Sequence, residues 1–302
     1  MSKRATTRRT PEERKAQAEA LHASIAAQVE ALRGSDQWRQ FLDFAQSFHA
    51  YSVNNVLLIL AQMPTASAVA GFRQWQAKGR QVRKGEKALK IFGYSTKKTT
   101  EEDPETGEEV ERRHVRFPVL SVFDISQTDP VDGEEPCTTV AHRLTGTDDL
   151  GIAAAVTDHL TNQGWTITRE NLDGHTNGYT SNDGRRVVVE TDLAPAQAAK
   201  TLIHEAAHIT LGHLDEDHRE YLEHRGVKEC EAESVAYVVA GLLGLDTSAY
   251  SIGYIATWAE SDPDADTLGT SEELHGTAAR VLAAVHTLAQ ALEPDQDEDL
   301  AA

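Results

Sequence analysis

The chain has 302 residues, of which 40% are hydrophobic, which is enough to fill one or two cores and excludes a wholly disordered protein. It contains no apolar run of about eighteen residues, and no apolar stretch follows its charged start, so we expect no membrane span, no secretory signal and a cytoplasmic location. Its two cysteines, Cys137 and Cys230, are too few for a disulfide framework.

The net charge of -19 is distributed unevenly along the chain. Residues 1–125 carry 20 Lys and Arg against 15 Asp and Glu, whereas residues 126–302 carry 9 against 33. The first part is therefore basic and the second strongly acidic. This asymmetry indicates two units with different partners, of which only the basic one suits contact with phosphates.

The first part of the chain is predicted to be helical at its start and stranded at its end. Thr10-Pro11-Glu12-Glu13 provides a capping hydroxyl, a helix-initiating proline and a reciprocal glutamate, so a helix should begin there and end at Gly34. The charged segment 97–113 should form a solvated hairpin or a mobile loop. Periodic patterns predict helices over 11–34, 35–48, 52–60 and 70–78, and strands over 80–82, 88–94 and 115–123.

The second part begins after a segment, 127–149, that is poor in large apolar residues and therefore reads as a domain boundary. Beyond it we expect helices over 150–163, 194–211, 227–243 and 272–292, and strands over 165–169, 178–180 and 186–190. The predicted fold is α+β with two domains. The expected parts are a basic tail at 1–9, a first domain at 10–128, a linker at 129–148, a second domain at 149–292 and an acidic tail at 293–302.

The sharpest chemical signal is the segment His204-Glu205-Ala206-Ala207-His208, inside the predicted helix 194–211. Two histidines four residues apart lie on one helix face, so both imidazoles can reach one tetrahedral zinc ion. Glu205 lies beside them, where it can accept a proton from water bound to that ion. A catalytic zinc site also needs a third protein ligand and an open position.

A third histidine does not fit the metzincin spacing, because Leu211 and Leu214 stand where that pattern requires glycine and histidine. His213 is one residue short of the required position. We expect it, together with His218 and His224, in a polar connection that follows the helix.

The third ligand is instead expected from the helix over 227–243, as in enzymes with two histidines and one glutamate. Glu229 and Glu233 are four residues apart and share a face with small alanines, whereas Glu231 points about 200° around the helix axis. We therefore predict Glu229 as the third ligand and Glu233 as the carboxylate that orients an imidazole N–H. Glu233 as the ligand is the alternative.

The implied reaction is hydrolysis, with a peptide bond in an unknown protein or peptide as the expected substrate. Zinc would lower the pKa of its water towards about 7, and Glu205 would accept the proton during attack on a carbonyl. Strands before the metal helix offer an edge to which an extended peptide could add. Tyr250, Tyr254 and Trp258 recur at a spacing of four and are expected in the core, although one tyrosine could stabilise the oxyanion.

A second informative segment is 71–98, where nine Lys and Arg residues accompany one acidic residue, Glu86, and aromatic residues are interleaved. Cations that hold a phosphate backbone and rings that stack on bases suit single-stranded DNA, although a solvated charged face is the alternative. Upstream, a tyrosine and two asparagines stand at a predicted helix start, where backbone N–H groups can meet a phosphate. The predicted nucleic-acid contacts are Tyr51, Asn54, Asn55, Arg73, Trp75, Lys78, Arg80, Arg83, Lys84 and Lys87.

Several motifs together resemble the ArdC-type antirestriction proteins. YSVNNVLLILAQ, GFRQWQAKGRQVRKGEKALKIFG and FPVLSVFDISQTD resemble that family's single-stranded-DNA-binding domain across roughly 10–128. HEAAH, ECEAESVAYVV and YSIGYIATWA resemble its zinc metallopeptidase domain, which is related in kind to the IrrE/ImmA peptidases. The resemblance implies DNA binding, a zinc ion and a role in mobile-element biology, and its ExxAE pattern falls on Glu229. The tails and the acidic loop 101–111 are not parts of the pattern.

The leading hypothesis is a zinc-dependent peptidase that a DNA-binding domain localises or gates. One alternative is a protein that protects DNA by occupancy alone and uses zinc only for its structure. Another is a transcription regulator that cleaves a repressor, in which the basic segment docks a protein partner.

Overall fold

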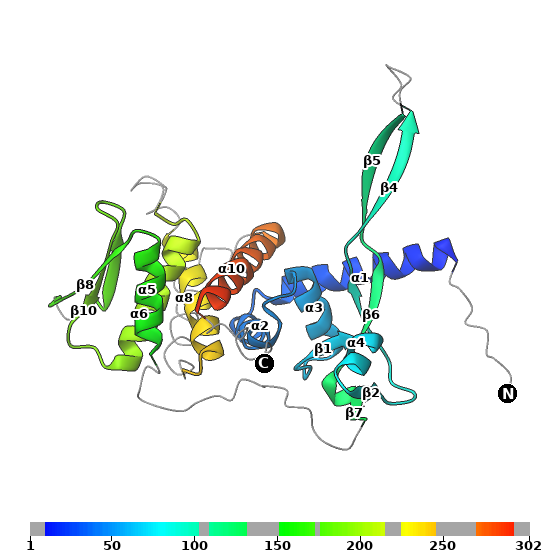
Figure 1. Ribbon diagram of the computed structural model, residues 1–302, viewed down its shortest axis with the longest axis horizontal. Helices are drawn as coiled ribbons and strands as arrows, with labels where there is room; N and C mark the ends of the chain where they lie inside the picture. Colours follow the sequence, from blue (N-terminus) through cyan, green and yellow to red (C-terminus); the bar gives the residue numbers. More distant parts are fainter. Residues whose placement is uncertain are drawn as a thin grey trace, which may run out of the picture. The chain divides into compact units, whose positions relative to one another are not determined.

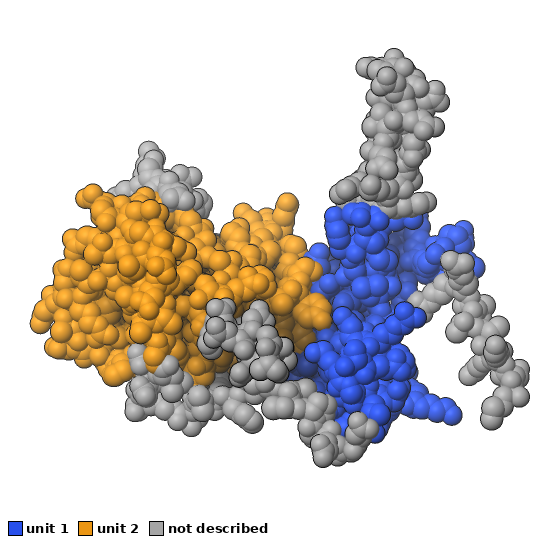
Figure 2. Space-filling view, viewed as in Figure 1, with its two compact units in different colours: residues 1–28, 54–137 blue, residues 29–53, 138–302 orange. Residues whose placement is uncertain are grey.

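The computed structural model describes residues 10–102, 109–131, 151–172, 176–214, 225–245 and 270–292. Two compact units make up the chain, and Figure 2 colours them separately. Unit 1 consists of residues 1–28 and 54–137, and unit 2 of residues 29–53 and 138–302. Within the described ranges, no helix has the length and apolar character needed to cross a membrane.

Unit 1 begins with the helix α1 (Pro11–Ala31), which starts where the sequence predicts it. The Thr10 N–H donates to Glu13 Oε2 at 2.8 Å and the Glu13 N–H donates to Thr10 Oγ1 at 3.1 Å, so the capping box is formed. The other helical elements are α3 (Val53–Gln62), α4 (Phe72–Ala77) and the short 3-10 helix η1 (Ile125–Gln127).

The strands of unit 1 form three small sheets. β1 (Val69–Gly71), β6 (Val119–Asp124) and β3 (Leu89–Phe92) make an antiparallel sheet in the order β1-β6-β3. β2 (Arg80–Val82) pairs with β7 (Thr128–Pro130). β4 (Ser95–Glu102) pairs with β5 (Glu109–Arg116) as an antiparallel ribbon, labelled in Figure 1. Of the two predictions for this charged segment, a hairpin or a mobile loop, the hairpin is the one observed.

Two predicted elements of unit 1 are wrong in their limits. The helix expected over 70–78 begins only at Phe72, because Gly71 is extended, pairs with β6, and donates its N–H to Gln74 Oε1 at 2.7 Å. The strand expected over 115–123 is divided at Pro118, which has no N–H to offer a sheet. The start of the helix depends on a local hydrogen bond, and the break in the strand on a missing N–H. The spacing of apolar residues predicts neither.

Unit 2 contains a three-stranded sheet and five helices among its described residues. β10 (Arg186–Glu190) lies between β8 (Thr166–Glu170), which is parallel to it, and β9 (Gly178–Ser181), which is antiparallel. β9 is therefore an edge strand of this sheet. The helices are α2 (Ser35–Phe48), α5 (Ile152–Asn162), α6 (Pro195–Thr210), α8 (Arg225–Leu242) and α10 (Ser271–Leu292), and the sequence predicts all five.

Helix α2 packs in unit 2, although the sequence assigns it to a first domain over 10–128. Its apolar stripe is fully buried, and Trp38 Nε1 donates to Ser234 Oγ on α8 at 3.1 Å. Tyr237 on α8 donates its hydroxyl to Asp43 on α2. These contacts join residues nearly two hundred positions apart, so a division of the chain by sequence order alone misses them.

Helices α6 and α8 lie side by side in unit 2, as Figure 1 shows. Small, fully buried residues lie beside the polar residues that the two helices share: Ala207 on α6, and Ala232 and Ala236 on α8. Small side chains let two helix backbones approach closely. The close approach brings the polar residues of the two helices within bonding reach of one another.

Candidate metal centre

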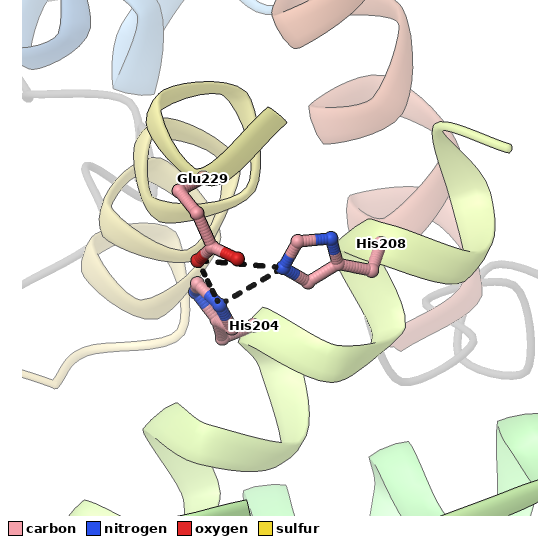
Figure 3. Close-up of side chains that lie close together, drawn as sticks. All are labelled: His204, His208 and Glu229. Carbon is pink, nitrogen blue, oxygen red and sulfur yellow. Dashed lines mark hydrogen bonds and ion pairs between the residues drawn. The ribbon is translucent and has the colours of Figure 1, made fainter. Parts of the chain in front are cut away.

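Three side chains from α6 and α8 converge on one point, as Figure 3 shows. The Nε2 atoms of His204 and His208 are 3.1 Å apart. Oε2 of Glu229 is 3.5 Å from the first of these nitrogens and 3.8 Å from the second. The structure therefore brings together the three ligands predicted from the sequence.

The donor atoms fit a small divalent cation. A point equidistant from the three atoms lies about 2.0 Å from each, which matches zinc bonds of about 2.0–2.2 Å to imidazole nitrogen and carboxylate oxygen. Two nitrogens and one oxygen also suit zinc and related ions by their chemistry. Three protein ligands leave a fourth position for water or substrate, which is the arrangement of catalytic rather than structural sites.

Two buried partners orient the imidazole of His204. Its Nδ1 lies 3.1 Å from Oε2 of Glu233, and Oε1 of Glu233 accepts from Lys200 Nζ at 2.6 Å. The Lys200 and Glu233 side chains are only 4% and 5% exposed. Glu233 thus touches the outer nitrogen of His204, which is the orienting position that the sequence predicts for it.

The carboxylates around His204 make the site electronegative. Burial alone would lower the pKa of His204, but hydrogen bonds to Glu229 and Glu233 and the nearby charge of Glu205 raise it to about 10. Burial would raise the pKa of both glutamates, yet contacts with His204 and His208 lower the pKa of Glu229 well below its usual range. Contacts with His204 and Lys200 lower the pKa of Glu233 to about 2. Such an excess of negative charge favours a bound cation.

Glu205 is buried beside the three ligands and is held by a residue that the sequence did not single out. Thr180 on β9 donates its hydroxyl to Oε2 of Glu205 at 2.6 Å. Gly178 on the same strand allows this approach: a Cβ there would lie 2.7 Å from Cγ2 of Thr201 and 2.8 Å from the backbone oxygen of Val188. The strand itself was predicted, but its register against α6 is a tertiary feature without a local signal.

A pocket of about 260 Å³ opens onto the site. It is lined by residues of α6 and α8 and by the segment that leads into β9. Polar side chains predominate: Thr176, Asn177, Gln197, Lys200, Thr201, His204, Glu205, Glu229 and Glu233. His204, Glu229 and Glu205 therefore border a space that a small molecule or an extended chain could enter.

His213 corrects one prediction. It is buried instead of lying in a polar connection, and its ring contacts His208 on one side and Glu231 on the other. Its position follows from the end of α6, where Gly212 adopts a positive φ of 74° and the His213 N–H donates to the His208 carbonyl at 3.0 Å. Burial lowers the pKa of His213. The predictions for His218, His224, Tyr250, Tyr254 and Trp258 fall outside the described residues.

Two of the predicted nucleic-acid contacts are wrong in this structure because their side chains are buried. Trp75 is 3% exposed and donates its indole N–H to the Phe123 carbonyl at 2.8 Å. Arg80 is 4% exposed and donates from Nε to Thr128 Oγ1 at 2.7 Å. A ring packed in the small core of unit 1 has no face on which a base can stack.

The other predicted contacts are distributed between structural and exposed positions. Asn55 bonds the backbone of Phe92 through both its amide oxygen and nitrogen, and Arg83 is engaged by Glu86 and Asp129. Tyr51 and Asn54 are partly buried, and Tyr51 belongs to unit 2. The side chains of Arg73, Lys78, Lys84 and Lys87 are exposed.

Unit 1 exposes a pair of aromatic residues, of which Tyr94 belongs to the interleaved aromatic residues of segment 71–98 and Phe117 lies outside that segment. Tyr94 is 71% exposed and Phe117 is 65% exposed, and their ring centroids lie 6.1 Å apart. They stand at the base of the β4–β5 ribbon. The sequence gives no sign that the two rings form a pair, because they are 23 positions apart in the chain.

Comparison with known proteins gives one family match. Residues 15–124 match the family described as the N-terminal domain of the anti-restriction factor ArdC. An uncharacterized protein of Bacillus anthracis is 26% identical over 295 residues. That match covers 86% of this chain and 49% of the other, so the chain spans about half the length of this curated relative.

Two solved structures are also similar, at low identity. The metal-free crystal structure of the antirestriction ArdC protein from the R388 plasmid is 23% identical, with a TM-score of 0.46, over 80% of this chain and 85% of that chain. The Mn(II)-bound structure of the same protein is 19% identical, with a TM-score of 0.43, over 85% of this chain and 99% of that chain.

Proposed function

We propose that this ArdC-type protein, whose residues 15–124 match the N-terminal domain of ArdC, binds single-stranded DNA and hydrolyses peptide bonds with a zinc ion. The observation that carries the hydrolase part is the convergence of His204, His208 and Glu229 beside the buried carboxylate of Glu205. The DNA-binding part is supported by the family match and by the exposed basic and aromatic residues of unit 1.

The residues of unit 2 have distinct roles in this proposal. His204, His208 and Glu229 would hold the ion, which when bound supplies a Lewis acid for a carbonyl and lowers the pKa of water. Thr180 fixes Oε2 of Glu205, so Oε1 is the atom that accepts the proton from the attacking water. The same carboxyl group then returns the proton to the leaving amine.

An extended peptide is the substrate class that suits the surroundings of the site. β9 is the edge strand of its sheet, and the segment that leads into it borders the pocket. An edge strand offers backbone N–H and C=O groups to a peptide that adds as a further strand. Such pairing would lay a peptide carbonyl near the metal ligands with little dependence on its side chains.

The hydrolase part is tested by removal of the ion. Zinc-loaded protein, chelator-treated protein and zinc-reconstituted protein are incubated with a host-cell extract, with and without single-stranded DNA, and new peptide termini are identified by mass spectrometry. We expect termini that disappear with the chelator and return with zinc. If all three samples give the same termini, the hydrolase proposal fails and protection of DNA by occupancy remains. If the cleaved protein is a transcriptional repressor, the result favours the alternative in which this protein is a transcription regulator.

The exposed pair of Tyr94 and Phe117 is the proposed stacking platform for bases. Two rings 6.1 Å apart at an exposed edge can each receive the face of a base, which requires no particular sequence. Exposed cations on the same unit, including Lys84 and Lys87, would contact phosphates. Trp75, which the sequence favours for stacking, has instead a structural role in the core.

We expect Tyr94→Ala and Phe117→Ala each to weaken binding of oligothymidine by about 1–3 kcal/mol, because each removes one stacking surface. Fluorescence anisotropy at several salt concentrations measures the affinity, and the slope against salt should be unchanged because no phosphate contact is lost. Tyr179→Ala is the matched control, since Tyr179 is an exposed aromatic residue on unit 2. Equal losses in all three variants would refute the assignment.

A further inference from the structure

We propose that His213, Glu231 and Arg280 form a hydrogen-bonded chain that holds His208 in the tautomer able to bind a metal ion. The three are positioning residues, because they act through His208 and do not touch the ion. The inference rests on the proposed metal centre, but the orientation of the chain can be measured without metal and without activity.

The chain runs from the metal ligand on α6 to α10. Nδ1 of His208 is 2.9 Å from Nδ1 of His213, and Nε2 of His213 is 3.0 Å from Oε2 of Glu231. Nε of Arg280 donates to Oε1 of Glu231 at 2.7 Å, and Nη2 donates to the same oxygen. Arg280 Nη2 also donates to Thr277 Oγ1 at 3.1 Å. His213 and Glu231 are both buried.

Arg280, at the end of this chain, determines which atom donates and which accepts in each of its hydrogen bonds. An arginine only donates and a carboxylate only accepts, so the imidazole of His213 must donate from Nε2 to Glu231. Neutral His213 then has a lone pair on Nδ1 and accepts from His208. Nδ1 of His208 must therefore carry the hydrogen, which leaves the lone pair of its Nε2 pointing at His204 and Glu229.

The other histidine of the candidate site, His204, has a similar chain of partners. Lys200 donates to Glu233, and Glu233 accepts from Nδ1 of His204. In both cases a cation fixes a buried carboxylate, and the carboxylate fixes the outer nitrogen of an imidazole, directly for His204 and through His213 for His208. Orientation by such outer partners is worth about 10–100-fold in metal affinity in other proteins.

Two substitutions test whether the donor–acceptor order of the hydrogen bonds matters, and not only the existence of the bonds. Glu231→Gln should turn its amide oxygen to Arg280 and its NH2 to His213, which reverses the direction and places the hydrogen of His208 on Nε2. His213→Gln keeps the direction, because its amide oxygen can accept from His208 while its NH2 donates to Glu231. Glu272→Gln, at an exposed position in the first turn of α10, is the control.

The experiment uses the full-length protein. Long-range ¹⁵N–¹H NMR of histidine-labelled, zinc-free protein reads the tautomer of His208, and competition with a chromophoric chelator gives the zinc Kd. We expect a Nδ1–H tautomer in the wild type, a zinc Kd raised about 10–100-fold in Glu231→Gln, a smaller rise in His213→Gln, and wild-type affinity in Glu272→Gln.

The tautomer of the wild type is decisive even if a variant fails to fold. A hydrogen on Nε2 of His208 in the zinc-free protein would overturn the inference, and so would wild-type zinc affinity in a folded Glu231→Gln variant. Failure of the proposed function has a different signature: no new peptide termini, or no zinc bound by the wild type, with the Nδ1–H tautomer still present.

Discussion

Glu205→Gln is expected to lower the rate of peptide hydrolysis by about 10²–10⁴-fold and to leave zinc binding intact. The amide has nearly the same shape as the carboxylate and can still accept a hydrogen bond from Thr180, so α6 and the ligands should keep their positions. An amide cannot take a proton from water, however, so the attacking nucleophile is no longer generated. Turnover of a peptide substrate identified in the extract experiment measures the effect.

The controls for this variant separate chemistry from structure. Glu272→Gln makes the same chemical change at an exposed position and should have no effect. Zinc stoichiometry and DNA affinity should equal those of the wild type in both variants. Undiminished turnover in Glu205→Gln would reject Glu205 as the base, and lost zinc would show that the substitution disturbs the site.

Lys200→Met is expected to lower the free energy of unfolding by about 3–5 kcal/mol, because it leaves the buried carboxylate of Glu233 without its cation. The length and volume of methionine resemble those of the lysine stem, so packing changes little. Denaturation by urea, followed by circular dichroism, measures the loss.

The double variant Lys200→Met with Glu233→Gln is the matched control for the charge. Its amide is neutral and can still accept from Nδ1 of His204, so much of the lost stability should return. If the double variant is as unstable as Lys200→Met alone, the loss comes from packing and not from an unpaired charge.

Local patterns predicted most elements of the fold. The Thr10–Glu13 capping box begins α1, and the stripe from Trp38 to Phe48 is buried as its helical spacing indicates. The α+β class is observed, and the family match confirms the ArdC-type resemblance over residues 15–124. These features succeed because each depends on residues that are close together in the chain.

The remaining features depend on contacts between distant segments. Thr180 reaches Glu205 only because β9 lies against α6, and Arg280 meets Glu231 from a helix 49 positions away. Trp75 looks like a stacking residue in sequence because a basic segment surrounds it, but the carbonyl of Phe123 binds its indole. Spacing within α6 and within α8 could therefore predict which three side chains converge at the candidate metal centre, whereas the residues that support them required the tertiary structure.

The packing of α2 against α8 has a consequence for any attempt to separate the two units. Because residues 29–53 belong to unit 2, the segment 54–137 of unit 1 stands in the chain between the two parts of the unit that carries His204, His208 and Glu229. A fragment starting at 149 would lack Trp38, and would therefore uncover the part of α8 around Ser234 that Trp38 contacts. A single proteolytic cut in the connection after unit 1 therefore cannot release an intact unit 2.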